Sequence, residues 1–269
     1  MKRTSYCKKD IVIAMCCVVF IAPVLGTIGT GGRMRAKEAV CLENLRRWGG
    51  IWQIYTDNNS GNFIRTVYWA DEEGLLVLYG GKKKSEVAKP GMSESEIHQA
   101  LFEANKLHFC PLAARTREQG EERRVFQAWE EWDATGSYGI NAWVTQCTGG
   151  GRGWEYLWKT PYVKTASEVP MVLDCLDYQN TAPYHRDEPP QYEGEPQPPG
   201  NINEIKRVVI NRHGSGAVNG AFMDFSARKV GLKELWELRW HRQWNAENEP
   251  APEWPEWMKD FKDYGAAGG

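Results

Sequence analysis

The first part of the chain contains its longest apolar run. No charged residue occurs from Ile11 to Ile28, and basic residues stand on both sides of this segment. A helix needs about 20 apolar residues to cross the hydrocarbon core of a bilayer, and about 17 suffice. The run therefore predicts a membrane-spanning segment. A secretory signal cleaved between Gly26 and Gly31, or a buried helix of a soluble protein, would have the same pattern.

A second hydrophobic pattern follows with helical spacing. One face of this predicted helix carries an apolar stripe formed by Cys41, Leu45, Trp48, Trp52 and Tyr55, while charged residues lie mostly off it. The sequence Asp57-Asn58-Asn59-Ser60-Gly61 predicts the end of the helix. Gly29–Gly32 is a candidate kink between the two helical segments. We expect the stripe to pack on a globular body.

The remaining pattern predicts an α+β domain built on an antiparallel sheet. Ser93 and Glu96 have capping-box spacing ahead of a helix with one apolar face. The predicted strands are 67–70, 75–79, 137–144 and 169–176, together with a hairpin that joins 205–211 to 217–230. Residues 177–200 contain six prolines and predict a long surface loop. Residues 231–244 predict a helix that carries Trp236, Trp240 and Trp244 on one face, and we expect this face to be buried where the helix packs on the sheet.

These elements divide the chain into four parts. Residues 1–32 hold the basic leader and the apolar segment, and residues 33–61 form the amphipathic helix. The α+β domain spans residues 62–231, and a Trp-rich helix and tail span residues 232–269. At 269 residues the chain is long enough for one sizeable core.

Composition excludes two broad classes of protein. The formal net charge is -2, whereas a general nucleic-acid binder carries a positive excess, so no nucleic-acid partner is expected. With 13 Trp, 11 Tyr and 8 Phe, the chain has too much apolar surface for a disordered protein. The composition thus favours a folded domain.

No specific catalytic motif is present, and we expect no enzymatic activity. The glycine-rich segments lack the residues of phosphate-binding loops, and no nucleophile elbow occurs. His213 and Asp224 are the one pair that could serve a hydrolase or hold a metal, but the sequence favours a structural, hydrogen-bonding role for the histidine at a strand end. The sequence thus predicts no catalytic residue, no cofactor-binding residue and no metal ligand.

One segment has a partial calcium-loop pattern. Asp57, Asn59 and Gly61 alternate as in the opening of an EF-hand loop, but Asn62 and Tyr68 stand where that loop has a glycine and a glutamate. The alternative is a plain Asx turn. Calcium is therefore the one cofactor considered.

Several of these segments, taken in order, resemble the prepilin-like, type II secretion pseudopilin-like proteins of planctomycete bacteria. The matching residues in the first part are Arg35, Cys41, Asn44, Leu45, Arg46, Gly50, Tyr55, Asp57 and Gly61. Later similar segments are 109–111, 137–141, 169–175, 212–242 and 254–258, and His213 with Asp224 corresponds to a degenerate form of the family's C-terminal H-X9-DG motif. In such proteins a peptidase cleaves a leader; here the processing site would lie between Ser5 and Tyr6, with Asp10 in place of the family's glutamate.

The resemblance implies a non-catalytic pilin-like subunit of a type II secretion or type IV pilus-like apparatus. The long N-terminal helix would cross the bacterial inner membrane once and hold an extracytoplasmic domain, and its partners would be like subunits through that helix. The alternative is a membrane-anchored binding module. In that module a surface with Trp236, Trp240, Trp244, Trp254 and Trp257 would face a polysaccharide or a protein.

Four cysteines fall in the expected extracytoplasmic domain, and four cysteines allow three connectivities. Cys41–Cys110 would tie the long helix to the body, and Cys147–Cys175 would tie two core strands. Four free buried thiols are the alternative. The spacings are too long to suggest a zinc site.

Overall fold

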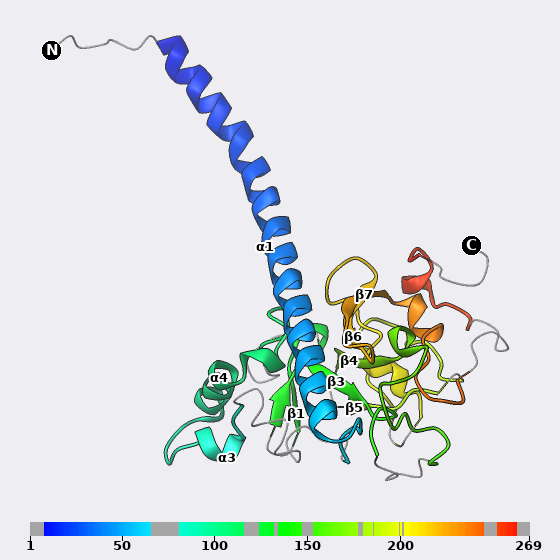
Figure 1. The fold of residues 1–269 in the computed structure, drawn as a ribbon. Coiled ribbons are helices and arrows are strands. Elements are labelled where there is room, and N and C mark those ends of the chain that lie inside the picture. The colour runs from blue at the N-terminus through cyan, green and yellow to red at the C-terminus, as the bar shows by residue number, and fades with distance from the viewer. Residues whose placement is uncertain are drawn as a thin grey trace.

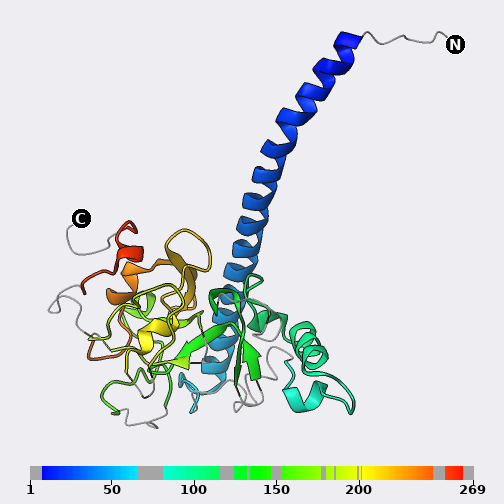
Figure 2. The same cartoon turned by 180° about the vertical axis from the view of Figure 1, so that it is seen from behind.

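A long helix and the globular body on which it packs make up the protein. A computed structural model describes residues 8–65, 81–115, 124–131, 134–146, 153–176, 180–184, 186–198, 200, 202–244 and 252–262, with side chains at 29 and from 31 onward. Figure 1 shows the helix leaving one side of the body, and Figure 2 shows the same arrangement from behind. The fold is α+β, as predicted.

Helix α1 spans Lys8–Asn58 without a break. It continues through Gly29–Gly32 and through Gly49–Gly50, so the expected division into two helices is not seen. A Cβ atom on Gly49 would lie 2.4 Å from the backbone oxygen of Phe225, which shows how closely the helix passes the body there. The helix stops where predicted, with Ser60 at φ 56° and Gly61 at φ 74°.

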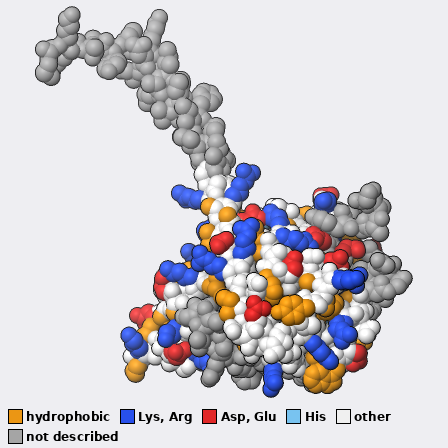
Figure 3. Space-filling view, viewed as in Figure 1, with side chains coloured by type: hydrophobic (Ala, Val, Ile, Leu, Met, Phe, Trp, Pro, Cys, Tyr) orange, Lys and Arg blue, Asp and Glu red, His pale blue; other side chains and the backbone are white. Residues whose placement is uncertain are grey.

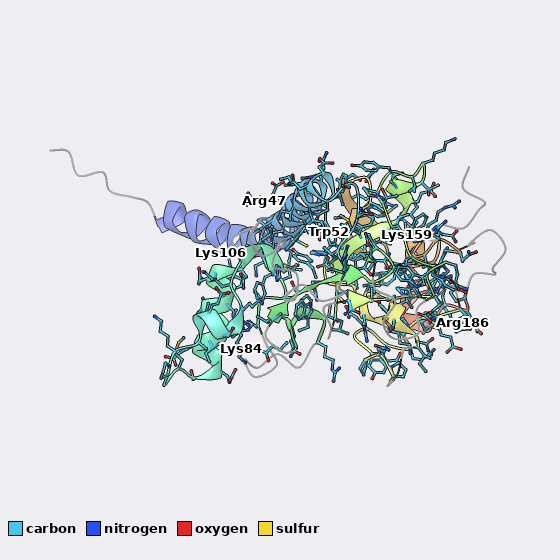
Figure 4. The ribbon with its side chains drawn as sticks, turned by 60° about the horizontal axis from the view of Figure 1, so that its bottom comes forward. Arg47, Trp52, Lys84, Lys106, Lys159 and Arg186 are labelled. Atoms are coloured by element: carbon cyan, nitrogen blue, oxygen red, sulfur yellow. The ribbon has the colours of Figure 1, made fainter. Side chains whose placement is uncertain are left out.

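The predicted apolar stripe of α1 is confirmed. Cys41, Leu45, Trp48 and Trp52 are all fully buried, and Tyr55 packs at the edge of the core. Figure 4 labels Trp52 and Arg47, and the side chain of Arg47 is 66% exposed. The polar face of α1 thus remains in solvent while the stripe covers the sheet.

The described residues contain no helix long and apolar enough to cross a membrane. The expected span, Ile11–Ile28, belongs to α1, but its side chains lie outside the described part of the chain. The proposed processing residues Ser5 and Tyr6, and the side chain of Asp10, also lie outside it.

The main sheet has five strands in the order β5-β3-β4-β6-β7. Their bounds are β3 Tyr138–Asn141, β4 Pro170–Asp174, β5 Asn180–Thr181, β6 Ala217–Phe222 and β7 Ala227–Gly231. The neighbours pair antiparallel except β3 and β5, which are parallel, so the sheet is mixed rather than purely antiparallel. Helix α1 packs on β4, β6 and β7. A separate antiparallel ladder joins β1 Trp129–Glu131 to β2 Ala134–Gly136.

The short helices stand around the sheet. Helix α3 spans Lys84–Val87 and α4 spans Glu94–Ala104, while the 3₁₀ turns are η2 Lys106–His108, η4 Arg124–Phe126, η6 Ala166–Glu168, η7 Glu204–Arg207, η8 Lys233–Trp236 and η10 Glu256–Met258. The predicted capping box is confirmed, because the Ser93 hydroxyl accepts the Glu96 N–H and the Glu96 carboxylate accepts the Ser93 N–H.

One predicted strand and one predicted loop differ from the structure. Residues 205–211 form no strand, because η7 covers Glu204–Arg207, and β6 pairs instead with β7 through a turn at Asp224–Ser226. A short apolar run does not distinguish a strand from a buried turn by periodicity alone, and this one is buried in irregular form. The proline-rich segment is also more than a surface loop, because it contains β5 and the buried Asp187. The predicted strands 67–70 and 75–79 lie outside the described residues.

The predicted C-terminal helix is wrong, although its tryptophans are buried. Only the 3₁₀ turn η8 occupies the segment 231–244. The indole N–H of Trp240 donates to the Leu235 carbonyl, and that of Trp244 donates to the Trp236 carbonyl. These side chains occupy carbonyls that the backbone of a helix would otherwise use. Trp236, Trp240 and Trp244 therefore serve as core residues.

Candidate functional site

Ligand-type side chains from four parts of the chain meet in the core beneath α1. The cluster consists of Cys41, Cys110, Asp174 and His213, and one donor atom from each lies within 4.8 Å of the others. Among the described residues it is the only group of its kind. All four residues are buried.

The elements of the fold place each of these residues. Cys41 belongs to the buried stripe of α1, and Asp174 is the last residue of the central strand β4. Cys110 lies in the segment after η2, where its backbone N–H donates to the Ser137 hydroxyl over 2.5 Å. His213 lies in the segment that leads into β6. The end of β4 therefore fixes where the other three side chains converge.

Asp174 is the centre of the hydrogen-bond network. Its Oδ1 accepts from Arg212 Nη1 over 2.9 Å, and its Oδ2 accepts the backbone N–H of Asn219 over 3.0 Å. His213 Nε2 lies 2.9 Å from the same Oδ2. Asn219 Nδ2 is 3.2 Å from His213 Nε2. The carboxylate is thus held on both oxygens.

Arg212 is fully buried and links the cluster to the surrounding backbone. Besides Asp174, it donates to the carbonyl oxygens of Val125, Ser137 and Cys175 at 2.7–3.0 Å. A buried guanidinium is tolerated only when it is paired and hydrogen-bonded. Arg212 meets that condition. Its hydrogen bonds to backbone carbonyls on three segments fix the guanidinium, and the guanidinium in turn positions the Asp174 carboxylate.

The two thiols have different neighbours in the cluster. Cys41 Sγ is 3.7 and 3.8 Å from the two oxygens of Asp174, and the Tyr138 hydroxyl is 3.3 Å from the same sulfur. Cys110 Sγ is 4.0 Å from His213 Nε2. His213 Nδ1 has no hydrogen-bond partner among the described residues. All described contacts of the imidazole therefore run through Nε2, toward the cluster.

Burial and mutual charge set the protonation of the cluster. Burial raises the pKa of Asp174, but the charges of His213 and Arg212 and their hydrogen bonds bring it down to about 2. Burial lowers the pKa of His213, but the Asp174 carboxylate raises it to about 10. Burial also raises the pKa of Cys110, but hydrogen bonds with Cys41 and His213 bring that pKa down to about 6. The pKa of Cys41 is raised well above its usual value, chiefly by burial. The pattern favours charge on Asp174 and, of the two sulfurs, on Cys110.

A thiol beside an imidazole and a carboxylate has the chemistry of a nucleophile or of a metal ligand. A nucleophile must reach a substrate, and Cys110, Cys41 and Asp174 are all 0% exposed. The arrangement therefore fits an internal structural role better than catalysis at the surface.

The structure gives His213 a different partner from the one considered in the sequence. Asp224 is exposed, and its Oδ1 accepts from the N–H and the hydroxyl of Ser226 in the β6–β7 turn. His213 pairs with Asp174 instead. The structure thus does not bring His213 and Asp224 together, because the carboxylate beside the histidine comes from the central strand β4 rather than from the β6–β7 turn.

The other predicted residues serve the attachment and the end of α1. Asn44 donates to the Phe109 carbonyl over 3.0 Å, and Leu45 is in the core. Asp57 Oδ1 accepts from the Tyr162 hydroxyl over 3.1 Å, and Asn59 donates back to the Tyr55 carbonyl. The contacts are those of a helix end and favour the Asx-type turn over a calcium loop.

Three of the four cysteines considered for disulfides are described. Cys41 and Cys110 are buried thiols, Cys175 is buried with its Sγ 3.7 Å from the Leu176 carbonyl oxygen, and Cys147 lies outside the described residues. Cys41 and Cys110 are brought together as expected, but as thiols rather than as a disulfide.

Sequence reasoning did not assign Asp174, Arg212, Asn219 or Tyr138 to a site. One signal in the sequence could have indicated these residues: some of them are polar residues inside, or at the end of, segments that are predicted to be buried strands. Such residues must find partners, because an unpaired buried polar group costs about 1–3 kcal/mol. Their partners come from distant segments, so the pattern could not identify them.

Comparison of the chain with protein-family models, with curated proteins and with solved structures finds no match.

Proposed function

We propose that this protein is a non-catalytic, pilin-like subunit that assembles with like subunits through its N-terminal helix. The observation that carries the proposal is the division of α1 into two parts. From Cys41 onward one face of the helix is buried in the body, whereas residues 31–37 are exposed all round. A helix rises about 1.5 Å per residue, so some 50 Å of α1 precede the buried part.

The sequence of the projecting part indicates what surrounds it. Its first portion contains the uncharged run Ile11–Ile28, and Arg33, Arg35 and Lys37 follow. Figure 3 shows basic side chains around the helix just outside the body. Apolar residues followed by long basic side chains suit a helix that leaves the hydrocarbon core at the level of the lipid head groups. In this proposal the inner membrane holds Ile11–Ile28 and the body lies on its extracytoplasmic side.

The attachment of α1 supports a passive, structural role. The helix packs on three strands of the sheet, and Glu38 pairs with Lys229 of β7 close to where the helix leaves the body. The contacts hold the projecting part at a fixed direction relative to the body. Subunits that present a helix in a fixed direction can stack in a regular array.

Photo-crosslinking of the full chain in bacterial membranes tests the proposal. A photoreactive amino acid at Val40, which is 50% exposed on α1, is expected to give homotypic cross-linked dimers and larger species. The matched control is the same substitution at Tyr192, which is 58% exposed on the body. Absence of homotypic products at Val40, or equal products at both positions, would contradict assembly through the helix.

The intact mass of the mature chain provides a second test. A start at Tyr6, or the complete chain, retains the helix that assembly requires. A start between Gly26 and Gly32 would release the body from the membrane and refute the proposal.

The alternative of a binding module retains one supporting observation. Trp254 borders a cleft of about 480 Å³ together with Glu188, Gln191 and Glu253. An indole beside carboxylates could stack on a sugar ring. Three of the tryptophans considered for such a surface do not add to it, because Trp236, Trp240 and Trp244 are buried. Loss of polysaccharide retention in Trp254→Ala, with no loss in Tyr162→Ala, would favour this alternative.

A further inference from the structure

We propose that Cys41, Cys110, Asp174 and His213 form a structural site for one zinc ion that fastens α1 to the sheet. The proposal assigns a ligand to the cluster and is independent of assembly through the N-terminal helix. Two thiolates, an imidazole and a carboxylate are the donor types that zinc binds in proteins. Such a set does not suit calcium or magnesium, which prefer oxygen ligands.

The distances between donor atoms suit a tetrahedral ion. Zinc bonds of about 2.0–2.3 Å place neighbouring donors about 3.3–3.8 Å apart. Cys41 Sγ lies 3.7 Å from Asp174 Oδ1, and Cys110 Sγ lies 4.0 Å from His213 Nε2. His213 Nε2 is 2.9 Å from Asp174 Oδ2, and no donor pair exceeds 4.8 Å. Side-chain shifts of less than about 1 Å along these edges would accommodate the ion.

The charges balance when the ion is bound. Two thiolates and the Asp174 carboxylate supply three negative charges, and zinc with the Arg212 guanidinium supplies three positive charges, so His213 binds as a neutral ligand. Arg212 and Asp174 both have 0% exposed side chains, so this balance is needed in a region without solvent screening. Arg212 thus acts as a partner to a ligand, not as a ligand.

The residues around the cluster hold two of its ligands, Asp174 and Cys41, in the way that metal sites require. Arg212 Nη1 and the Asn219 N–H each donate to a different oxygen of Asp174, and the Tyr138 hydroxyl lies 3.3 Å from Cys41 Sγ. His213 Nε2 faces the other ligands, whereas His213 Nδ1 has no hydrogen-bond partner among the described residues. Such outer contacts orient metal ligands and tune their affinity.

The site would be structural rather than catalytic. Its four ligands are protein side chains, whereas a catalytic zinc keeps one position open for water or substrate. None of Cys41, Cys110 and Asp174 is exposed. The ligands come from α1, from the segment after η2, from β4 and from the segment before β6, so one ion would join four parts of the fold. Metal binding and folding are coupled in such sites.

Mass spectrometry of the full chain, purified in mild detergent without chelators or metal columns, tests the proposal. Under native conditions we expect the mass of the chain plus one zinc ion, less the displaced protons. Under denaturing conditions we expect the mass of the metal-free chain with all its cysteines reduced. A metal-free chain under native conditions would overturn the proposal. This holds if the thiols are reduced, and also if the mass is lower by two hydrogens because Cys41 and Cys110 form a disulfide.

Variants locate the ion. Cys110→Ser is expected to lose the zinc, while Cys175→Ser is the matched control, because Cys175 is also a fully buried cysteine but lies outside the cluster. Zinc retained in Cys110→Ser, or lost equally in both variants, would overturn the assignment. Tyr138→Phe removes one hydroxyl beside Cys41 and is expected to lower zinc affinity about tenfold in competition with a chromogenic chelator.

Cobalt replacement keeps the proposal testable if Cys110→Ser does not fold. The wild-type chain and Cys175→Ser, loaded with Co²⁺, are expected to show the same thiolate-to-cobalt charge-transfer band and the intense visible bands of a tetrahedral ion. A spectrum without thiolate bands, or one typical of an octahedral ion, would overturn the proposal.

Discussion

Replacing Arg212 by Met is the sharpest test of how the core is held together. The substitution keeps an apolar stem in place and removes the guanidinium, which donates to Asp174 and to three backbone carbonyls. Breaking a buried ion pair by removing one partner costs about 3–5 kcal/mol. The Val125 and Cys175 carbonyls would each lose a donor, at about 1 kcal/mol apiece. The Ser137 carbonyl keeps a second donor, the backbone N–H of Cys175, and adds little.

The expected loss is therefore about 5–7 kcal/mol, which is comparable to the whole stability of many domains. Arg239→Met is the matched control. Arg239 Nε lies 2.8 Å from Glu168 Oε2, much as Arg212 Nη1 lies 2.9 Å from Asp174 Oδ1, but both side chains of the control pair are about half exposed. An exposed pair contributes about 0–1 kcal/mol. Burial, not the distance between charges, thus separates the two predictions.

Urea unfolding of the full chain in mild detergent measures both variants. Tryptophan fluorescence provides the signal, since 13 Trp are present and many are buried. Arg212→Met is expected to be unfolded or to unfold at low urea, while Arg239→Met should match the wild type. A loss below about 2 kcal/mol for Arg212→Met would refute the reasoning, because His213 and the Asn219 N–H would then suffice to stabilise the buried Asp174 carboxylate without Arg212.

Three further predictions concern other parts of the fold. Gly49→Ala should destabilise the protein by about 2 kcal/mol, because its Cβ would meet the Phe225 backbone oxygen. Gly50→Ala has open space around its Cβ and should stabilise α1 by up to about 1 kcal/mol. Thermal unfolding of the two variants compares these effects. Burial raises the pKa of Asp187 to about 6, so its contribution to stability is present below about pH 4 and is lost as the pH rises through 6. Asp187→Asn should therefore flatten the pH dependence of unfolding between pH 4 and 6, and an unchanged slope would contradict this cause. Ser93→Ala should destabilise α4 by about 1 kcal/mol, seen as faster amide exchange in its first turn.

Periodicity was sufficient to predict the elements that bury one continuous face. The stripe of α1, the strands at 138–141 and 170–174, and the cap at Ser93 all follow from the spacing of neighbouring residues. The segment 231–244 has equally good helical spacing, yet it is mostly irregular, and indole N–H groups pair with two of its carbonyls. Local pattern alone contains no information about such competition.

The cluster could not be predicted in the same way. His213 was recognised as a candidate, but its sequence neighbour Asp224 turns into a surface hairpin while Asp174 arrives from the middle of the sheet. The long sequence spacing of Cys41 and Cys110 argued against zinc, because common zinc motifs bring ligands close together in the chain. Here the packing of α1 on the sheet brings the four ligands together, whereas in those motifs the ligands are already close in the sequence.

The position of Cys41 has a mechanical consequence. Along α1 it is the first buried residue after the exposed stretch, so tension applied to the N-terminal end reaches the core there, once the ion pair of Glu38 with Lys229 has been passed. Its sulfur adjoins Tyr138 of β3 and Asp174 of β4, and β4 is the central strand of the sheet. At Cys41, a force on the helix would thus act on the middle of the sheet, where β4 is hydrogen-bonded to a strand on each side. Such a force would not separate an edge strand one hydrogen bond at a time.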